Sequence, residues 1–94
     1  MANKTPDNNA ILLADCILEL KTRDEVYAFL EDLCTPHEAR EMSRRLLAAK
    51  LLRSGALYSE VTEITGLSAA TISRVSRCLR YGSDGYKIVL ERVE

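Results

Sequence analysis

The chain has 94 residues, of which 47% are hydrophobic and 29% charged, with a formal net charge of -1. This length allows one small domain, which we expect over residues 9–94, after a disordered polar tail at residues 1–8. The near-neutral net charge argues against a uniformly basic nucleic-acid binder. Acidic side chains dominate residues 1–39 and basic ones residues 40–80, which suggests a local footprint for an anionic partner, although solvated helix faces would give the same pattern.

The three cysteines, Cys16, Cys34 and Cys78, are widely spaced and lie among apolar residues. No CxxC pair or Cys/His cluster accompanies them, so we expect buried, reduced structural thiols and neither a zinc site nor a cofactor. Reduced thiols, a polar N-terminus and the lack of a long apolar run favour a soluble, cytoplasmic protein without a membrane partner. His37 is the only histidine, and no catalytic constellation indicates an enzyme.

Two apolar helices are predicted before residue 35. The first runs from about residue 9 to residue 20, and its apolar side chains cover more than one face, which favours burial against several partners, including a second subunit. The second begins at a capping box formed by Thr22 and Glu25 and ends near Cys34. Its apolar side consists of Val26, Tyr27, Phe29, Leu30 and Leu33.

A long third helix is predicted over residues 36–54. It begins at a second capping box, formed by Thr35 and Glu38, with a proline at the first helical position. Gly55 follows as the residue that closes the helix. Its apolar stripe consists of Met42, Leu46, Ala49 and Leu52, widened by Leu47 and Leu51.

Residues 58–80 have the pattern of a helix-turn-helix. A short helix over residues 59–65 places Val61 and Ile64 on one inward face. Gly66 provides a tight turn, and Leu67 fills the angle between the two helices. Ser68 is a suitable N-cap for the second helix, over residues 69–81. An ordinary helical hairpin is the alternative that the glycine spacing alone leaves open.

The second helix of this motif has the features of a DNA-recognition helix. Its inward positions are Ile72, Val75 and Leu79, at helical spacing. Its first turns expose small and polar side chains, as a helix that enters the major groove requires. We expect base-edge contacts from Ser68, Ala69, Ala70, Thr71 and Ser73, base or phosphate contacts from Arg74 and Arg77, and phosphate contacts from Arg40, Arg44, Ser59 and Thr62.

The end of the chain is less clearly patterned. Residues 82–85 form a predicted flexible turn. Residues 86–90 then begin either a short last helix or a fraying tail. Their Ile88, Val89 and Leu90 require a hydrophobic partner.

The order of these elements resembles the tryptophan repressor superfamily, and within it the repressor-related group called YerC/YecD. The likeness covers roughly residues 12–85. It is carried by Asp32-Leu-Cys-Thr35, Arg45-Leu46, Ala70-Thr-Ile-Ser-Arg74 and Arg77-Cys-Leu-Arg-Tyr-Gly82. The resemblance implies an all-α, intertwined homodimer in which the first three helices of both subunits share one core. It also implies double-stranded operator DNA, with a two-fold-symmetric site, as the partner.

The resemblance also bears on a small-molecule effector. In the tryptophan repressor the corepressor lies between the long helix and the recognition helix. Local alignment matches positions of that pocket to Thr35, Arg45, Thr71, Arg74 and Cys78. Val75 stands where the repressor has a glycine that makes room for the indole, and Cys78 stands where it has a serine, so tryptophan is not expected to bind. An exposed helix cation or an intersubunit ion pair is the alternative role for Arg45, and the sequence names no other effector.

Two functions of different classes follow. The first is a sequence-specific transcriptional repressor that works without tryptophan and reads DNA largely through water or DNA shape. The second is a protein-interaction module that kept the fold and lost DNA binding. A steep fall of duplex binding with salt would distinguish the first from the second.

Overall fold

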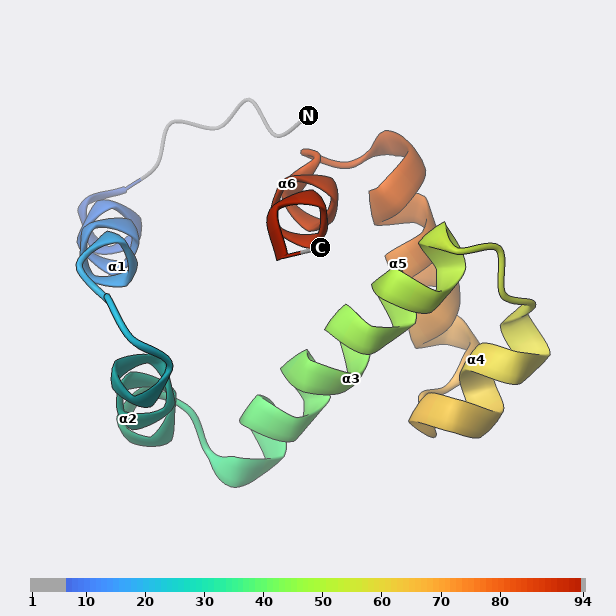
Figure 1. Ribbon diagram of the computed structural model, residues 1–94, viewed down its shortest axis with the longest axis horizontal. Coiled ribbons are helices and arrows are strands. Elements are labelled where there is room, and N and C mark those ends of the chain that lie inside the picture. The colour runs from blue at the N-terminus through green and yellow to red at the C-terminus, as the bar shows by residue number, and fades with distance from the viewer. Residues whose placement is uncertain (1–6, 94) are drawn as a thin grey trace. The chain divides into compact units, whose positions relative to one another are not determined.

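The computed structural model describes residues 7–93 and contains, within that range, six α-helices and no β-strand (Figure 1). The prediction of an all-α fold is therefore confirmed. The helices are α1 (Asn8–Leu18), α2 (Arg23–Leu33), α3 (Pro36–Arg53), α4 (Tyr58–Thr65), α5 (Ala69–Tyr81) and α6 (Gly85–Val93). They divide into two compact units, the first ending at Ala39 and the second beginning at Arg40. The single domain expected over residues 9–94 stays a prediction.

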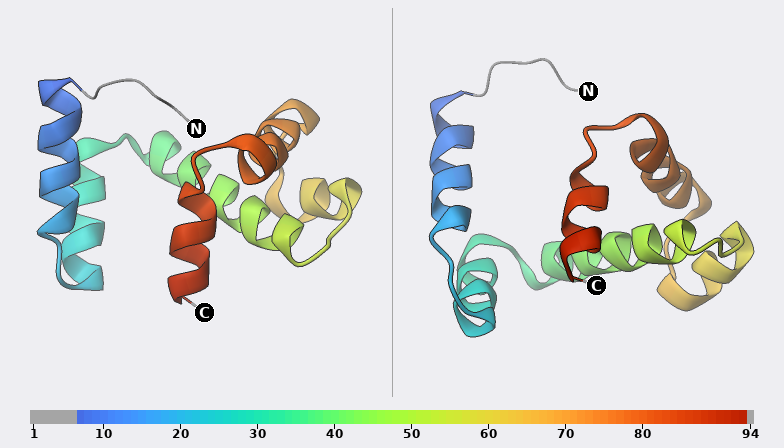
Figure 2. Two further views of the ribbon diagram at one scale, coloured as in Figure 1. Left: turned by 90° about the horizontal axis from the view of Figure 1, so that it is seen from above. Right: turned by 45° about the horizontal axis from the view of Figure 1, so that its top comes forward.

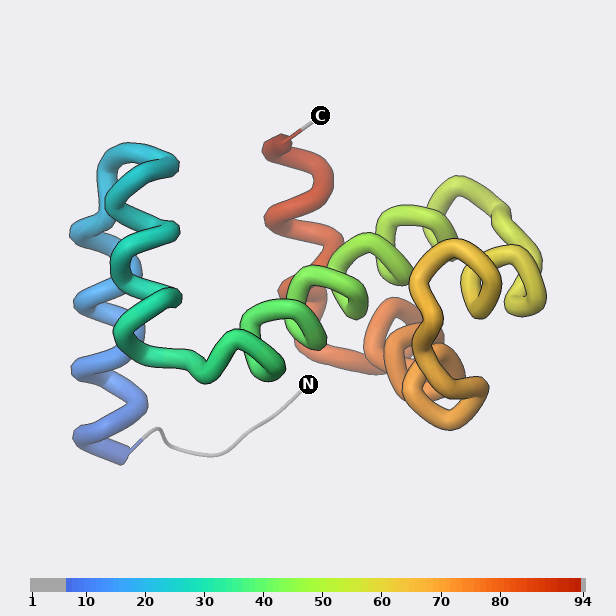
Figure 3. Tube along the Cα trace, turned by 90° about the horizontal axis from the view of Figure 1, so that it is seen from below, coloured from blue at the N-terminus to red at the C-terminus, as the bar shows by residue number. Residues whose placement is uncertain are grey.

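The first unit contains α1 and α2, which run antiparallel to each other (Figure 3). The carboxylate of Asp7 accepts a hydrogen bond from the Ala10 N–H at 2.7 Å and so caps α1. Asp7 and Asn8, which the prediction placed in the tail, therefore cap and begin α1, and residues 1–6 lie outside the described part of the chain. At the start of α2 the Thr22 hydroxyl accepts from the Glu25 N–H at 3.1 Å, and this predicted cap is confirmed.

The cysteine environments differ from the prediction. Cys16 is exposed on this chain, whereas Cys34 and Cys78 are half-buried, and all three are free thiols. The expectation of buried thiols is thus not met by Cys16 on the single chain, without the second subunit against which α1 is expected to pack. The reason is that α1 has no buried residue, so the apolar side chains beside Cys16 are themselves open.

The start of α3 is held by a complete capping box. The Thr35 hydroxyl accepts from the Glu38 N–H at 3.1 Å, and the Glu38 carboxylate accepts from the Thr35 N–H at 2.8 Å. The pKa of Glu38 is held below its ordinary value by hydrogen bonds to Thr35. The bond from the Thr35 backbone N–H has the larger effect, and the bond with the Thr35 side chain the smaller. The sequence prediction of this helix start is confirmed.

We expect the free energy of unfolding to depend on the ionisation of Glu38. Because its pKa is lower in the folded chain than in the unfolded one, its contribution is fully present above the unfolded pKa and is lost as the pH falls through the folded pKa. Glu38→Gln should flatten the acid limb of a stability profile measured by urea unfolding, whereas Glu31→Gln, at an exposed position in α2, should leave it steep. Equal slopes in the wild type and the Glu38 variant would contradict this.

The end of α3 is closed by the predicted glycine. Gly55 has φ +94°, in the left-handed region that favours glycine. The N–H groups of Gly55 and Ala56 donate to the carbonyls of Leu52 and Leu51, each at 3.1 Å. This pair of bonds is the one by which glycine-terminated helices satisfy their last carbonyls.

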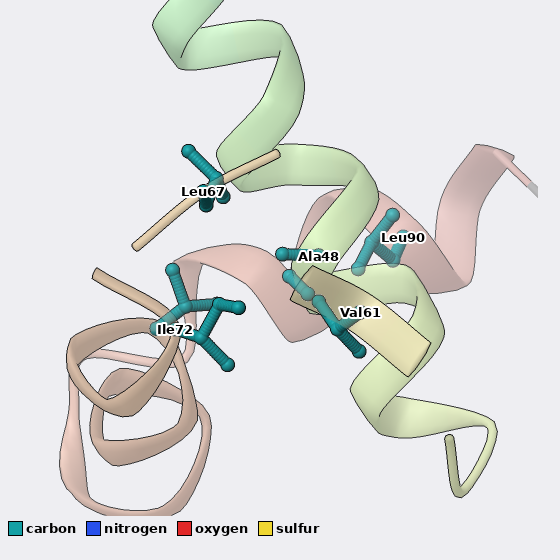
Figure 4. Close-up of a cluster of buried hydrophobic side chains, with 7 residues drawn as sticks. Ala48, Val61, Leu67, Ile72 and Leu90 are labelled. Atoms are coloured by element: carbon teal, nitrogen blue, oxygen red, sulfur yellow. The ribbon is translucent and has the colours of Figure 1, made fainter. Parts of the chain in front are cut away.

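The core of the second unit forms where α3, α4, α5 and α6 contribute side chains to one cluster (Figure 4). The part of α3 that is buried differs from the predicted stripe, because Met42 and Leu46 are exposed whereas Ala48 and Ala49 are fully buried. The buried hydrophobic residues are Ala48, Ala49, Val61, Leu67, Ile72, Val75 and Leu90.

The C-terminal segment forms a helix, α6, and not a fraying tail. Leu90 is buried in the core, and Arg53 of α3 pairs with Glu91 at 3.2 Å. Ile88 and Val89, which were expected to need a partner, are exposed on this chain. Within residues 7–93, no helix has both the length and the apolar composition to cross a bilayer.

Candidate nucleic-acid interface

The chain turns a corner between α4 and α5 (Figure 2). This corner is fixed by its backbone and by one buried hydroxyl. Gly66 has φ +73°, and its N–H donates to the Thr62 carbonyl at 2.8 Å. The buried Thr65 hydroxyl donates to the Val61 carbonyl at 2.7 Å and accepts from the Leu67 N–H at 3.2 Å. Leu67 is buried in the core, as predicted. The turn therefore holds α5 in a defined direction relative to α4.

One inward position of α4 was predicted wrongly. Val61 is fully buried, but Ile64 is 58% exposed and lies beside Ser59, Glu60 and Glu63 around a shallow surface hollow. Thr65 takes the inward place instead, four residues after Val61. The Thr65 hydroxyl can be buried because it donates to the Val61 carbonyl. A prediction from hydrophobicity alone therefore chose Ile64 in place of Thr65.

The inward side of α5 agrees with the prediction. Ile72 is fully buried, Val75 is 1% exposed, and Leu79 is half-buried against the same core. Ser76 is also buried and was not predicted. The α5 helix contacts both α4 and α6, so its position in the second unit is fixed from two sides.

The first turn of α5 presents small polar groups on a capped helix end. Ser68 caps the helix, because its Oγ accepts from the Thr71 N–H at 3.2 Å. The Ser68 hydroxyl also donates to Thr71 Oγ1 at 3.1 Å. Thr71 is half-buried, whereas the other predicted base-edge residues are exposed: Ser68, Ala69, Ala70 and Ser73.

The positive charges of α5 lie on its exposed surface. Arg74 and Arg77 are exposed, and in the described part of the chain neither is paired with a carboxylate. Tyr81, which is 77% exposed, lies one turn after Arg77 on the same face.

The candidate phosphate contacts outside α5 are of two kinds. Arg40 and Arg44 are exposed in the N-terminal half of α3 and are free to reach an anion. Ser59 and Thr62 are exposed on α4 but are less suited to that role. The Thr62 hydroxyl donates its proton to the Tyr58 carbonyl at 3.0 Å, and Ser59 shares its surface hollow with two glutamates.

The residues matched to an effector pocket come from both units, and their role as a pocket stays a prediction. Thr35 belongs to the first unit, where both its hydroxyl and its N–H bond Glu38. In the second unit Arg45 is half-buried on α3, like Thr71 and Cys78 on α5, and Arg74 is exposed. Among residues 7–93, no group of three or more His, Cys, Asp or Glu side chains is arranged to hold a metal ion.

Comparison with known proteins decides the family. The family profile described as Trp repressor protein matches residues 9–94. The chain belongs to this family. It is 48% identical over 82 residues to the uncharacterised protein YerC of Bacillus subtilis (strain 168), and the match covers 87% of this chain and 79% of YerC.

Two crystal structures of family members agree with the fold. One is a Trp repressor candidate from Staphylococcus aureus, with a TM-score of 0.89 and 41% identity over 94% of this chain and 88% of that protein. The other is a TrpR-like protein from Eubacterium eligens ATCC 27750, with a TM-score of 0.88 and 47% identity over 93% of this chain and 90% of that one. The family and the α4–α5 corner together give the chain the fold of a helix-turn-helix regulator.

Proposed function

We propose that the protein is a sequence-specific DNA-binding transcriptional regulator, acting as a repressor on a two-fold-symmetric operator to which it binds as a homodimer. The observation that carries the proposal is the two-sided nature of α5. Its inner side is anchored by the fully buried Ile72, while its outer side exposes Ser73, Arg74 and Arg77. This function requires neither catalysis nor a cofactor. Because the proposed partner is DNA, the proposed location of the protein is the cytoplasm.

The geometry of α5 suits the major groove. The helix has 13 residues, which corresponds to a length of about 20 Å. Its first turn carries Ala69 and Ala70, whose small side chains let the backbone approach base edges in a groove about 12 Å wide. Arg74 and Arg77 follow on the next turns, where phosphates or guanines come within reach of long side chains.

Selection from random duplex DNA at two salt concentrations tests this function. A DNA-binding regulator should enrich a symmetric sequence, and its affinity should fall steeply with salt because phosphate contacts release counterions. The competing function is a protein-interaction module, which the net charge of -1 favours. No enrichment, together with salt-insensitive capture of a protein partner, would establish that alternative and overturn ours.

Arg74→Ala should weaken duplex binding without unfolding the protein, because Arg74 is exposed. If the guanidinium meets a phosphate, affinity should fall for all sequences and the salt slope should decrease by about one ion. If it meets a guanine, the loss should be confined to sites that carry this base. Titrations at several salt concentrations measure both, with Arg23→Ala in α2 as the control. Wild-type binding by a folded Arg74 variant would rule out this role.

L-tryptophan should not bind. The side chain of Val75 is 1% exposed and packed in the core, so the position that is a glycine in the tryptophan repressor is filled here. Inserting an indole beside it would require overpacking, at a cost of about 1–3 kcal/mol. Calorimetric titration should show no heat of binding up to a ligand concentration of about 1 mM, which would detect a dissociation constant in the micromolar range. Micromolar binding would refute the steric argument and return Arg45 and Arg74 to the role of ligand contacts.

A further inference from the structure

We infer that the outer face of α4 is a docking surface for a second protein, which binds there through a basic, amphipathic helix. This face, called here the α4 patch, consists of Leu57, Glu60, Glu63 and Ile64. The inference goes beyond the proposed function and does not depend on it, because none of these four side chains takes part in the proposed reading of DNA.

Two large apolar side chains lie open in the α4 patch. Leu57, the N-cap residue of α4, is 66% exposed, and Ile64 is 58% exposed. Because Glu60 lies three residues after Leu57 and four before Ile64, all three fall on one side of the helix. Seven helical residues rise about 10 Å, so the two apolar side chains match a pair that is two turns apart on a partner helix.

The folding of this chain does not account for Leu57. A helix is stabilised by Ser, Thr, Asp or Asn at its N-cap, whereas leucine is a poor residue there. Leu57 also gains little burial in return, since α4 enters the core through the fully buried Val61. A docking partner gives this exposed leucine a role that the single chain does not.

The charge of the α4 patch is negative within a basic part of the chain. Of residues 40–80, which are rich in arginine, only Glu41, Glu60 and Glu63 are acidic, and the last two line the surface hollow of α4. The Glu60 carboxylate is held in place, because it accepts from the Leu57 N–H at 2.8 Å. Glu63 is exposed and has no ion pair in the part of the chain that the structure describes.

These charges decide between the possible occupants. Two carboxylates repel phosphates, so DNA does not fit the α4 patch. A second copy of this chain, related by a two-fold axis through the patch, would bring Glu60 and Glu63 against the same carboxylates. A helix with Lys or Arg between its apolar side chains instead offers opposite charge to the glutamates and covers Leu57 and Ile64.

Selection from a phage-displayed library of random peptides of about 16 residues, about four helical turns, tests the inference on the full-length chain. The library is first depleted on the double variant Leu57→Ser, Ile64→Ala, so that only peptides requiring these apolar side chains remain. Serine is a good N-cap and Ile64 is exposed, so this variant should stay folded, which circular dichroism would verify. The wild type should then enrich peptides that carry Lys or Arg beside apolar residues.

The charge requirement is measured separately, on the enriched peptides. Glu60→Gln with Glu63→Gln removes both charges, while the new amide oxygen still accepts from the Leu57 N–H and keeps the cap. Peptide affinity should fall about 2–30-fold, as for the loss of two exposed ion pairs. Glu31→Gln with Asp32→Asn removes the same charge from exposed positions of α2 and should leave the affinity unchanged.

Two results would overturn the inference. One is that the depleted library yields no peptide that binds the wild type. The other is that the enriched peptides are not basic, or bind the variant without Glu60 and Glu63 as tightly as the wild type. Neither result affects the proposed regulator function, which is decided by the selection of duplex DNA.

Discussion

Replacing Ile72 by alanine is expected to destabilise the protein by about 2–5 kcal/mol, the range for deleting most of a buried isoleucine. Ile72 is fully buried and is among the largest side chains of the core to which α3, α4, α5 and α6 contribute. The whole stability of a domain this small is about 5–15 kcal/mol, so one cavity at this position removes a large fraction of it. Urea unfolding followed by circular dichroism measures the loss.

Ile64 provides a matched control for that experiment. It is the same residue type in the same helix-turn-helix, but its side chain is 58% exposed. Ile64→Ala should therefore change stability by only about 0.5 kcal/mol. Equal losses in the two variants would show that the packing of α4 and α5 differs from the one described.

The same pair of variants connects stability with DNA binding. Ile72 faces the core from α5, so its loss loosens the helix that carries the proposed base contacts, and duplex binding should fall together with folding. Ile64 lies on the outer side of α4, and its alanine variant should bind the selected duplex like the wild type. The burial of one side chain thereby determines whether the proposed reading helix is held in place.

The helix limits were predictable because the signals for them are local. The hydroxyls of Thr22, Thr35 and Ser68 each cap an N–H group three residues later, and Gly55 and Gly66 end helices with positive φ. All of these contacts lie within five residues along the chain. Their geometry therefore follows from the residue type and spacing, without knowledge of the remaining fold.

The errors concern choices that depend on neighbours distant in sequence. Either Ile64 or Thr65 could have faced inward on α4. Thr65 does so, because its hydroxyl is satisfied by a hydrogen bond to the Val61 carbonyl. Ala48 is fully buried, although an alanine gives little apolar signal. Cys16 was expected inside because its neighbours are apolar, yet whether those neighbours are covered depends on contacts that a sequence pattern does not specify.

The candidate interface was predictable in composition but not in detail. The exposed residues of α5 were identified from their spacing, since Ile72 and Val75 define the opposite, buried side. The hydrogen-bond partners of each hydroxyl could not be identified from the sequence. Thr62 and Thr71 are the same residue type, and only the structure shows that Thr62 bonds the Tyr58 carbonyl and that Thr71 bonds the Ser68 hydroxyl. The contacts of these residues with DNA stay predictions.

The protein is expected to be an obligate homodimer whose formation depends on α1. Of the α1 side chains, Leu12 is 63% and Leu18 is 78% exposed, and the helix has no buried residue. Ile88 and Val89 of α6 are also exposed. An exposed apolar helix face such as that of α1 marks an interaction site, and a second copy of the chain is the partner that the proposed symmetric operator requires.

Replacing both Leu12 and Leu18 by glutamate should abolish the dimer. Covering one leucine side chain contributes about 1.5–3 kcal/mol, so two per subunit contribute about 3–6 kcal/mol, and a buried unpaired carboxylate adds a further penalty. Light scattering at micromolar concentration should give about twice 10.5 kDa for the wild type, and a monomer or unfolded chain for the double variant. Asn9→Glu adds a carboxylate at an exposed polar position of the same helix and should leave the dimer intact.

The dimer variant also tests how the reading helices act together. Each subunit contributes one α5, and two half-sites of a helix-turn-helix operator lie about one DNA turn, or 34 Å, apart. A chain that cannot dimerise engages one half-site only, so its affinity for the symmetric duplex should fall far more than that of the Arg74 variant. A wild-type chain that is folded, stable and monomeric at micromolar concentration would contradict the shared core, and the exposed face of α1 would then require a different partner.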